Sequence, residues 1–221
     1  MGKLTWAERL KRFRQQHEEQ YARVLMTQPG QTTLLQAVPN PGVVLMMGKK
    51  GAGKSATAHK VAESLHKSRK MPAILHLPGH VPDNLRRQVQ RLLPDWMKVV
   101  TSTESWPTRA VVIVDEAAQS AHARRTQSKD AVELDALMSI SRQKSQVILF
   151  VSHHSRKLDP NIVRDADRIW WKEPTYAHWM FERNELEDFV LKALELFQHA
   201  RPRDRTRLTL NMDFHNFTFS Q

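Results

Sequence analysis

The fold expected of this chain follows from one stretch of its sequence, Val43-Val44-Leu45-Met46-Met47-Gly48-Lys49-Lys50-Gly51-Ala52-Gly53-Lys54-Ser55. Its first part, residues 43–47, is wholly apolar, as in a short strand that is buried on both faces of a sheet. Its second part, residues 48–55, fits the phosphate-binding pattern G-x-x-x-x-G-K-[ST], the P-loop. The residues that follow, up to Arg69, are typical of a helix. Because a P-loop lies between a strand and a helix, we predict a phosphate site here.

Each residue type in the P-loop has a physical reason. Glycines let backbone N–H groups turn inward around the phosphates, and the N-terminus of the following helix adds its positive dipole. Lys54 would reach the β- and γ-phosphates, and the hydroxyl of Ser55 would ligate Mg²⁺. We therefore expect ATP and Mg²⁺ as cofactors. The expected nucleotide-binding residues are Gly48, Lys49, Lys50, Gly51, Ala52, Gly53, Lys54 and Ser55.

A second motif is the apolar strand at residues 110–114, which ends in Asp115 and Glu116. Asp115 stands where P-loop NTPases hold the magnesium ion, so Ser55 and Asp115 are the expected metal ligands. Glu116 resembles the catalytic glutamate of the additional-strand ATPases, a base that deprotonates the attacking water. A nucleotide kinase transfers the phosphoryl group to an acceptor and does not need this glutamate. The motif therefore favours hydrolysis, with Lys54 and Glu116 as catalytic residues.

Strands and helices alternate along the middle of the chain. The expected strands lie at residues 43–47, 73–77, 98–101, 110–114, 146–151 and 167–171, and the expected helices at residues 54–69, 82–92, 130–141 and 186–197. Short apolar strands separated by helices predict a parallel sheet covered on both faces. The expected fold class is α/β, an open, mostly parallel, doubly wound sheet that resembles the RecA-like additional-strand type of P-loop NTPase.

The two ends of the chain differ from this core. Apolar residues recur at helical spacing from Trp6 to Val24 and predict an amphipathic helix over residues 6–25, followed by a linker rich in proline and glycine. This helix would pack on the main domain or on a neighbouring subunit, with a DNA-binding arm as the alternative. Beyond residue 200, alternating arginines lead into an edge strand or an arm that binds capsid, DNA or a neighbour. We therefore divide the chain into residues 1–40 (N-terminal helix and linker), 41–200 (ATPase core) and 201–221 (basic C-terminal tail).

The charge and composition of the chain limit its partners and location. Lys and Arg number 34 against 23 Asp and Glu, which gives a formal net charge of +11. This excess favours a nucleic-acid partner first and an anionic membrane surface second, with solubility alone as the alternative. The chain contains no cysteine, which excludes disulfides and thiolate zinc sites and fits the cytoplasm. Its apolar runs are shorter than the roughly 20 residues that cross a bilayer, so we expect no transmembrane segment.

The region after the second motif resembles the FtsK–HerA superfamily of DNA-pumping ATPases. The resemblance covers roughly residues 43–174, and it includes the turn at residues 141–146 and the strand at 147–151 that leads into Ser152, His153 and His154. In this superfamily the strand commonly ends in Gln, and His153 stands in its place. An imidazole can still accept from or donate to a γ-phosphate or the lytic water, with a pH sensitivity that an amide lacks. The resemblance thus implies a catalytic role for His153. The alternative is a histidine with only a structural role, hydrogen-bonded at the end of the strand.

The resemblance also implies that some residues act away from the nucleotide site of their own chain, on a neighbouring subunit or on DNA. Arg142 would cross a ring interface as an arginine finger and stabilise transition-state charge at a neighbour's γ-phosphate. Arg109, Arg124 and Arg125 are its rivals, and an ordinary surface arginine is the alternative. The basic stretch after the second motif would face the channel of the ring and hold DNA phosphates through Arg124, Arg125 and Lys129. A solvated loop is the other interpretation of this stretch.

Within the superfamily, this short chain resembles the genome-packaging ATPases of membrane-containing double-jelly-roll viruses and phages. That resemblance implies translocation of double-stranded DNA by a homo-oligomeric ring, a hexamer or pentamer, in the host cytoplasm or associated with the virion. Capsid-vertex or membrane proteins would be further partners. The zonular-occludens-toxin-like assembly ATPases of filamentous phages come second, because they usually carry a transmembrane segment. A small-molecule nucleotide kinase or NTPase and a non-catalytic assembly protein remain as other classes.

Overall fold

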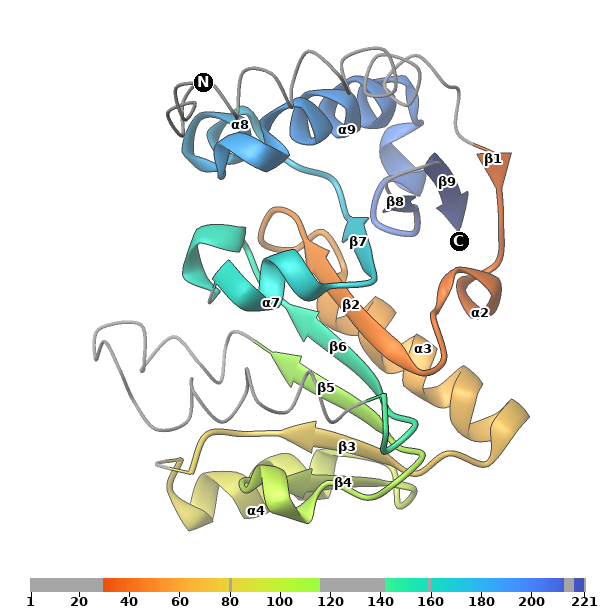
Figure 1. Ribbon diagram of the computed structural model, residues 1–221, viewed down its shortest axis with the longest axis vertical. Coiled ribbons are helices and arrows are strands. Elements are labelled where there is room, and N and C mark those ends of the chain that lie inside the picture. The colour runs from red at the N-terminus through yellow and green to blue at the C-terminus, as the bar shows by residue number, and fades with distance from the viewer. Residues whose placement is uncertain (1–29, 80, 116–141, 159, 213–216, 221) are drawn as a thin grey trace, which may run out of the picture.

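The computed structural model describes residues 30–79, 81–115, 142–158, 160–212 and 217–220. Within them the chain forms a nine-stranded sheet with the strand order β1-β9-β8-β7-β2-β6-β5-β3-β4 (Figure 1). The strands are β1 (Gly30–Gln31), β2 (Gly42–Met47), β3 (Ala73–His76), β4 (Met97–Val100), β5 (Val111–Asp115), β6 (Val147–Val151), β7 (Arg168–Trp171), β8 (Thr209–Met212) and β9 (Phe217–Ser220). The described helices are α2 (Leu34–Ala37), α3 (Lys54–Arg69), α4 (Asp83–Leu92), α7 (Pro160–Asp165), α8 (Tyr176–Phe181) and α9 (Glu187–His199).

The direction of the strands places the functional motifs at one edge of the sheet. From β7 through β2, β6, β5 and β3 to β4, neighbouring strands run parallel, whereas β8 pairs antiparallel with both β7 and β9. The P-loop follows β2, Asp115 ends β5, and His153 comes shortly after β6. All three therefore lie at the carboxyl ends of parallel strands, where ligands bind in open α/β sheets.

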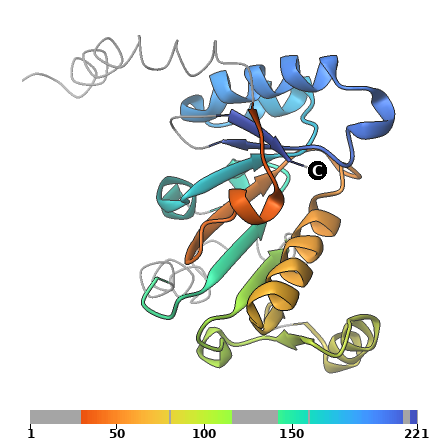
Figure 2. The ribbon, with the colours of Figure 1, turned by 90° about the vertical axis from the view of Figure 1, so that its right-hand side faces the viewer.

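The side chains of β2 alternate between two cores on opposite faces of the sheet. Val43, Leu45 and Met47 pack with side chains of α9 and α7. Val44 and Met46 pack with side chains of α3, which runs along the other face (Figure 2). Every residue of β2 is buried, because successive side chains point to opposite faces and both faces are covered. This double burial explains the wholly apolar sequence of the strand.

The expected fold class is confirmed. Each strand expected in the core lies within one residue of its expected bounds, and α3 begins and ends at the expected residues. The helices expected at residues 6–25 and 130–141 fall outside the described residues. The short helices α2, α7 and α8 were not expected from the sequence, and α2 and β1 lie in the segment that was expected to be a linker. Among the described residues, no helix is long and apolar enough to cross a membrane.

Residues beyond 200 take part in the same sheet as the core. All four residues of β8 are buried, and this strand lies between β7 and β9, so it is not at the edge of the sheet. One polar group of this strand bonds to its neighbour inside the sheet: the amide nitrogen of Asn211 donates to the hydroxyl of Ser220 at 3.2 Å. Of the alternatives considered for this segment, a strand is the one observed. The domain boundaries at residues 40 and 200 stay predictions.

Candidate nucleotide-binding site

Two of the P-loop glycines, Gly48 and Gly53, have a conformation and surroundings that exclude side chains. Gly48 has φ +142° and Gly53 has φ +88°, both in the region that favours glycine. A Cβ atom on Gly48 would lie 2.8 Å from the carbonyl oxygen of Lys172, and one on Gly53 would lie 2.9 Å from the carbonyl oxygen of Thr206. The loop therefore packs closely against the segments that carry Lys172 and Thr206, and Gly53 forms the N-cap of α3.

Lys54 lies at the start of α3 and its side chain turns back over the P-loop. Its Nζ donates to the carbonyl oxygens of Gly48 at 2.7 Å and Lys49 at 2.9 Å. The Nδ1 atom of His153 lies 3.2 Å from the same Nζ and 3.3 Å from the carbonyl oxygen of Gly48. The structure thus brings Lys54 and His153 together at the P-loop, where the sequence placed both.

The two expected metal ligands are also in contact. The hydroxyl of Ser55 donates to Oδ2 of Asp115 at 2.6 Å. Mg²⁺ prefers oxygen ligands and is usually held by one or two protein side chains together with phosphate oxygens and water. Among the described residues, no group of three or more His, Cys, Asp and Glu side chains is placed to hold a metal ion. A hydroxyl and a carboxylate beside a P-loop fit Mg²⁺ held jointly with a nucleotide.

His154 and His178 were not anticipated as part of the site. Their rings stack with centroids 4.4 Å apart, and His178 is 4% exposed. Burial, together with repulsion from His154, Lys54 and His153, lowers the pKa of His178 to about 4, although a hydrogen bond with the Gly48 backbone opposes this shift. His178 is therefore neutral near pH 7. Its Nδ1 accepts from the backbone N–H of Thr175 at 3.2 Å, which completes the N-terminal cap of α8.

A charged network behind the P-loop was also not anticipated. Glu173 lies 2.7 Å from Nζ of Lys49 and 3.1 Å from the guanidinium of Arg205, and its carbonyl oxygen accepts from the N–H of Lys49 at 3.0 Å. Burial alone would raise the pKa of Glu173, but the hydrogen bonds and charges of Lys49 and Arg205 outweigh it and lower the pKa. The P-loop is thereby tied to residues near position 205.

Arg142 lies far from the P-loop of its own chain. Its guanidinium is 2.6 Å from Oδ1 of Asp167, whose Oδ2 accepts from the N–H of Val43 at 2.8 Å. These contacts place Arg142 at the amino ends of β6, β7 and β2, whereas the P-loop lies at the carboxyl end of β2. A strand of five residues spans roughly 15 Å, so this arginine does not reach its own nucleotide site. Its action on a neighbouring subunit stays a prediction.

Several expected site residues fall in the segment 116–141, which lies outside the described residues. They are Glu116, Arg124, Arg125 and Lys129. Arg109 precedes β5, and its N–H donates to the carbonyl oxygen of Lys144 at 2.8 Å, so this rival of Arg142 lies at the same amino edge of the sheet.

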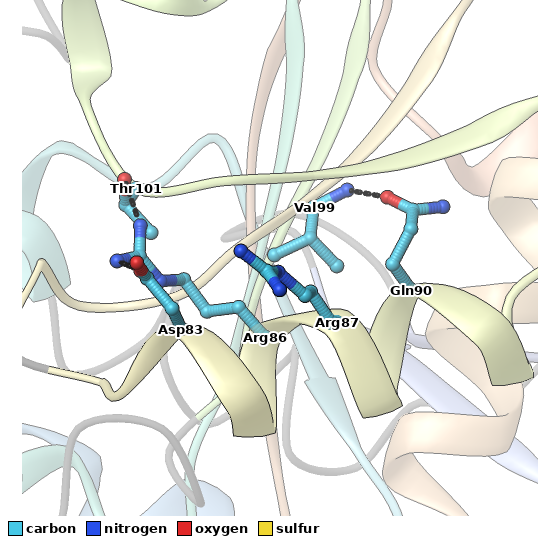
Figure 3. A pocket seen from close by; sticks show the side chains of 6 residues that line it. All are labelled: Asp83, Arg86, Arg87, Gln90, Val99 and Thr101. Carbon is cyan, nitrogen blue, oxygen red and sulfur yellow. Dashed lines mark hydrogen bonds and ion pairs between the residues drawn. The ribbon is translucent and has the colours of Figure 1, made fainter.

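A separate hollow of about 370 Å³ lies between α4 and β4, at the far edge of the sheet (Figure 3). It is lined by Asp83, Arg86, Arg87, Gln90, Val99 and Thr101. Arg86 donates to Asp83 and, at 3.4 Å, to the hydroxyl of Thr101, while Gln90 accepts from the N–H of Val99 at 2.7 Å. Strands β6, β5 and β3 separate β4 from β2. The hollow is therefore too far from the P-loop to hold an acceptor for its phosphoryl group.

Comparison with known proteins identifies the class of the chain. Residues 44–173 match the family described as ATPase family associated with various cellular activities (AAA). The chain belongs to this family, and it is an ATP-hydrolysing enzyme with an α/β P-loop fold. A search of curated proteins found no match.

Solved structures of viral packaging proteins share the fold. The genome-packaging NTPase B204 of Sulfolobus turreted icosahedral virus 2, solved with sulfate, has a TM-score of 0.56 and 15% identity, over 82% of this chain and 97% of that one. The same protein solved with ATP-gammaS has a TM-score of 0.54 and 17% identity, over 83% and 98%. The DNA-packaging ATPase B204 from Sulfolobus turreted icosahedral virus has a TM-score of 0.55 and 16% identity, over 83% and 98%. The expected resemblance to genome-packaging ATPases is confirmed.

Proposed function

We propose that this protein is a Mg²⁺-dependent ATPase motor that moves double-stranded DNA into a viral capsid. The observation that carries the proposal is the likeness in fold, over 82% of the chain, to a genome-packaging NTPase. The net charge of +11 supports it, because a protein that moves along DNA of any sequence must hold phosphates. We place the protein in the FtsK–HerA superfamily on the residues between the P-loop and His153.

The chemistry proposed for the site begins with Mg²⁺ bound by Ser55 and, through water, by Asp115. The bound ion would neutralise charge on the β- and γ-phosphates. Lys54 has an ammonium at the mouth of the P-loop and would bind the same phosphates. Nδ1 of His153 lies 3.2 Å from that ammonium, which supports a role in which His153 would contact the γ-phosphate or the attacking water. Glu116 would accept the proton of that water.

The proposed working unit is a homo-oligomeric ring, a hexamer or pentamer. Arg142 is at the edge of the sheet opposite to the P-loop and its side chain is 66% exposed, so it is accessible to a neighbouring subunit. In the ring it would reach the neighbour's γ-phosphate. Arg124, Arg125 and Lys129 would hold DNA phosphates in the channel. The host cytoplasm and the virion are the proposed locations, with capsid-vertex or membrane proteins as further partners.

The test is the ATPase rate with and without double-stranded DNA, together with the mass of the assembly by light scattering. We expect DNA of unrelated sequences to raise the rate and the mass to correspond to five or six chains. The Lys54→Ala variant is the control, because it removes the phosphate-binding ammonium and should show no rate with or without DNA. A DNA-independent rate from a monomer would contradict the motor and leave a small-molecule NTPase.

A further inference from the structure

Lys172 is a buried lysine at the back of the P-loop. It follows β7 directly, and its backbone N–H donates to the carbonyl oxygen of Met47 at 2.8 Å, one residue before Gly48. Its side chain is 0% exposed. Lysine is almost never buried this completely unless it is paired, because an unpaired buried charge loses its hydration. The position therefore calls for a physical explanation.

The ammonium of Lys172 has two neutral acceptors, both late in the chain. Nζ donates to the carbonyl oxygen of Thr206 at 2.8 Å and to the hydroxyl of Thr209 at 3.3 Å. Neither acceptor carries a charge that would balance the ammonium. These bonds hold the end of β7 to the start of β8, in addition to the antiparallel pairing of the two strands.

The same ammonium lies against the helix end that would bind phosphate. A Cβ on Gly53 would lie 3.7 Å from Cε and 3.9 Å from Nζ of Lys172, while one on Gly48 would touch the Lys172 backbone. Gly53 is the N-cap of α3, and the N–H groups at such a helix end bind phosphates. Lys172 thus lies against the backbone of the P-loop at the N-terminus of α3, and adds a positive charge there.

The charged groups around Lys172 do not neutralise it. Burial, together with repulsion from Lys60 on α3, lowers its pKa to about 8. The adjacent carboxylate of Glu173 is bound to Lys49 and Arg205. Lys54, on α3, adds another positive charge to the loop. An anion bound in the P-loop would therefore be the missing counter-charge, and its presence favours the protonated form of Lys172.

We propose that Lys172 is a positioning residue for nucleotide phosphates, which adds a buried positive charge behind Gly53 and holds Thr206 and Thr209 against the P-loop. Phosphate binding and protonation of this lysine are then coupled: each favours the other. The inference rests on the nucleotide site and not on the DNA motor, so it stands whether or not DNA stimulates the ATPase.

The first experiment compares Lys172→Met with Lys192→Met in the full chain. Lys192 is also buried, at 8% exposed, but its ammonium pairs with Glu195 on the surface of α9. We measure the dissociation constant of Mg-ADP at pH 7 by calorimetry, and the unfolding temperature of both variants. Both are expected to lose stability, but only Lys172→Met should bind ADP about tenfold more weakly, the equivalent of one pKa unit of coupling. Equal ADP affinity in the two variants would overturn the proposal.

The second experiment is the pH profile of ADP binding, which a purely structural role would not change. In the unaltered protein we expect affinity to fall as pH rises above about 8, because the ammonium loses its proton there. The fall should be absent in Lys172→Met. Thr209→Val keeps the lysine and the shape of β8 but removes one acceptor, so it should move the fall to lower pH. A fall that persists in Lys172→Met, or that stays at the same pH in Thr209→Val, overturns the coupling.

Discussion

The hydroxyl of Ser55 and the carboxylate of Asp115 are joined by a hydrogen bond of 2.6 Å, although 60 positions separate them in the sequence. Ser55 is in the first turn of α3, which follows β2, and Asp115 ends β5. Strand β6 lies between those two strands. The parallel pairing of β6 with both neighbours places the ends of β2 and β5 at the same edge, and this register brings the two side chains together.

Removal of the Ser55 hydroxyl should weaken Mg²⁺ binding and leave the fold intact. We expect Ser55→Ala to raise the Mg²⁺ concentration for half-maximal ATPase at least about tenfold, the scale of a lost metal-site interaction. Ser64→Ala is the matched control, because Ser64 is on the same helix and donates only to the backbone of Lys60. A Mg²⁺ requirement that is the same in both variants would argue against Ser55 as a ligand.

Substitutions of Lys54 and Glu116 should have different effects, the first on nucleotide binding and the second on hydrolysis. Lys54→Ala removes the ammonium at the phosphate site and should lose nucleotide affinity. Glu116→Gln should keep that affinity and turn over at least about 10²-fold more slowly, the scale of a lost general base. Equilibrium binding of ATP-gammaS and steady-state ATPase rates measure the two effects. Near-normal turnover by Glu116→Gln would exclude it as the base.

Arg142→Ala should abolish activity with little loss of stability. The Arg142 side chain, which pairs with Asp167, is 66% exposed. Exposed ion pairs contribute less than about 1 kcal/mol to the free energy of unfolding. Mixed rings of Arg142→Ala and Glu116→Gln chains should recover ATPase activity, because some interfaces combine an intact finger with an intact glutamate. If co-assembled mixtures stay inactive at every ratio, Arg142 does not act on a neighbour.

Replacement of Arg124 and Arg125 by Ala should weaken DNA binding equally for unrelated sequences. Each phosphate that the protein neutralises adds about −0.9 to the slope of log affinity against log salt, so the slope should flatten by roughly one unit for each phosphate that the variant no longer holds. A salt titration with two unrelated duplexes tests this, with basal ATPase expected to stay largely intact. An unchanged slope would place the DNA path elsewhere, on the N-terminal segment or among the arginines after residue 200.

His178 should make the fold sensitive to acid. Its pKa is about 4 in the folded chain against an ordinary 6.5, so the unfolded chain binds more protons between these values. The resulting stabilisation is present above pH 6.5 and is lost as pH falls toward 4, by up to about 3 kcal/mol. His178→Gln keeps a side chain that can complete the cap with Thr175. Urea unfolding at about pH 7 and about pH 4.5 should show a smaller loss in this variant, and an equal loss would contradict the assignment.

The sequence predicted the elements of the site that follow from local patterns. The P-loop and Asp115 were predicted because each combines an apolar strand with polar residues at a fixed offset. The bounds of α3 were predicted because the helix begins within the same motif. His153 was expected near the P-loop because it follows a buried strand of the same parallel sheet, and such strands share a carboxyl edge, while its catalytic role stays a prediction.

The residues behind the P-loop could not be predicted, because their roles depend on long-range pairing. Lys172 follows an apolar strand, as many surface lysines do, and only the pairing of β7 with β8 buries it against Thr206. Arg205 was one of several alternating arginines, and nothing local distinguishes it as the partner of Glu173. His178 is likewise brought to the site only by α8, a helix too short to give a clear pattern.

The contact between the P-loop and Thr206 also sets a limit on how the protein is made. A ribosome must synthesise residues 43–55 and then about 150 further residues before Thr206 and Thr209 exist to complete the back of the loop. Chains are synthesised from the N-terminus at about 5–20 residues per second, so the P-loop lacks these contacts for roughly ten seconds or more after its own synthesis. The complete nucleotide site therefore cannot form before Thr206 and Thr209 have been synthesised.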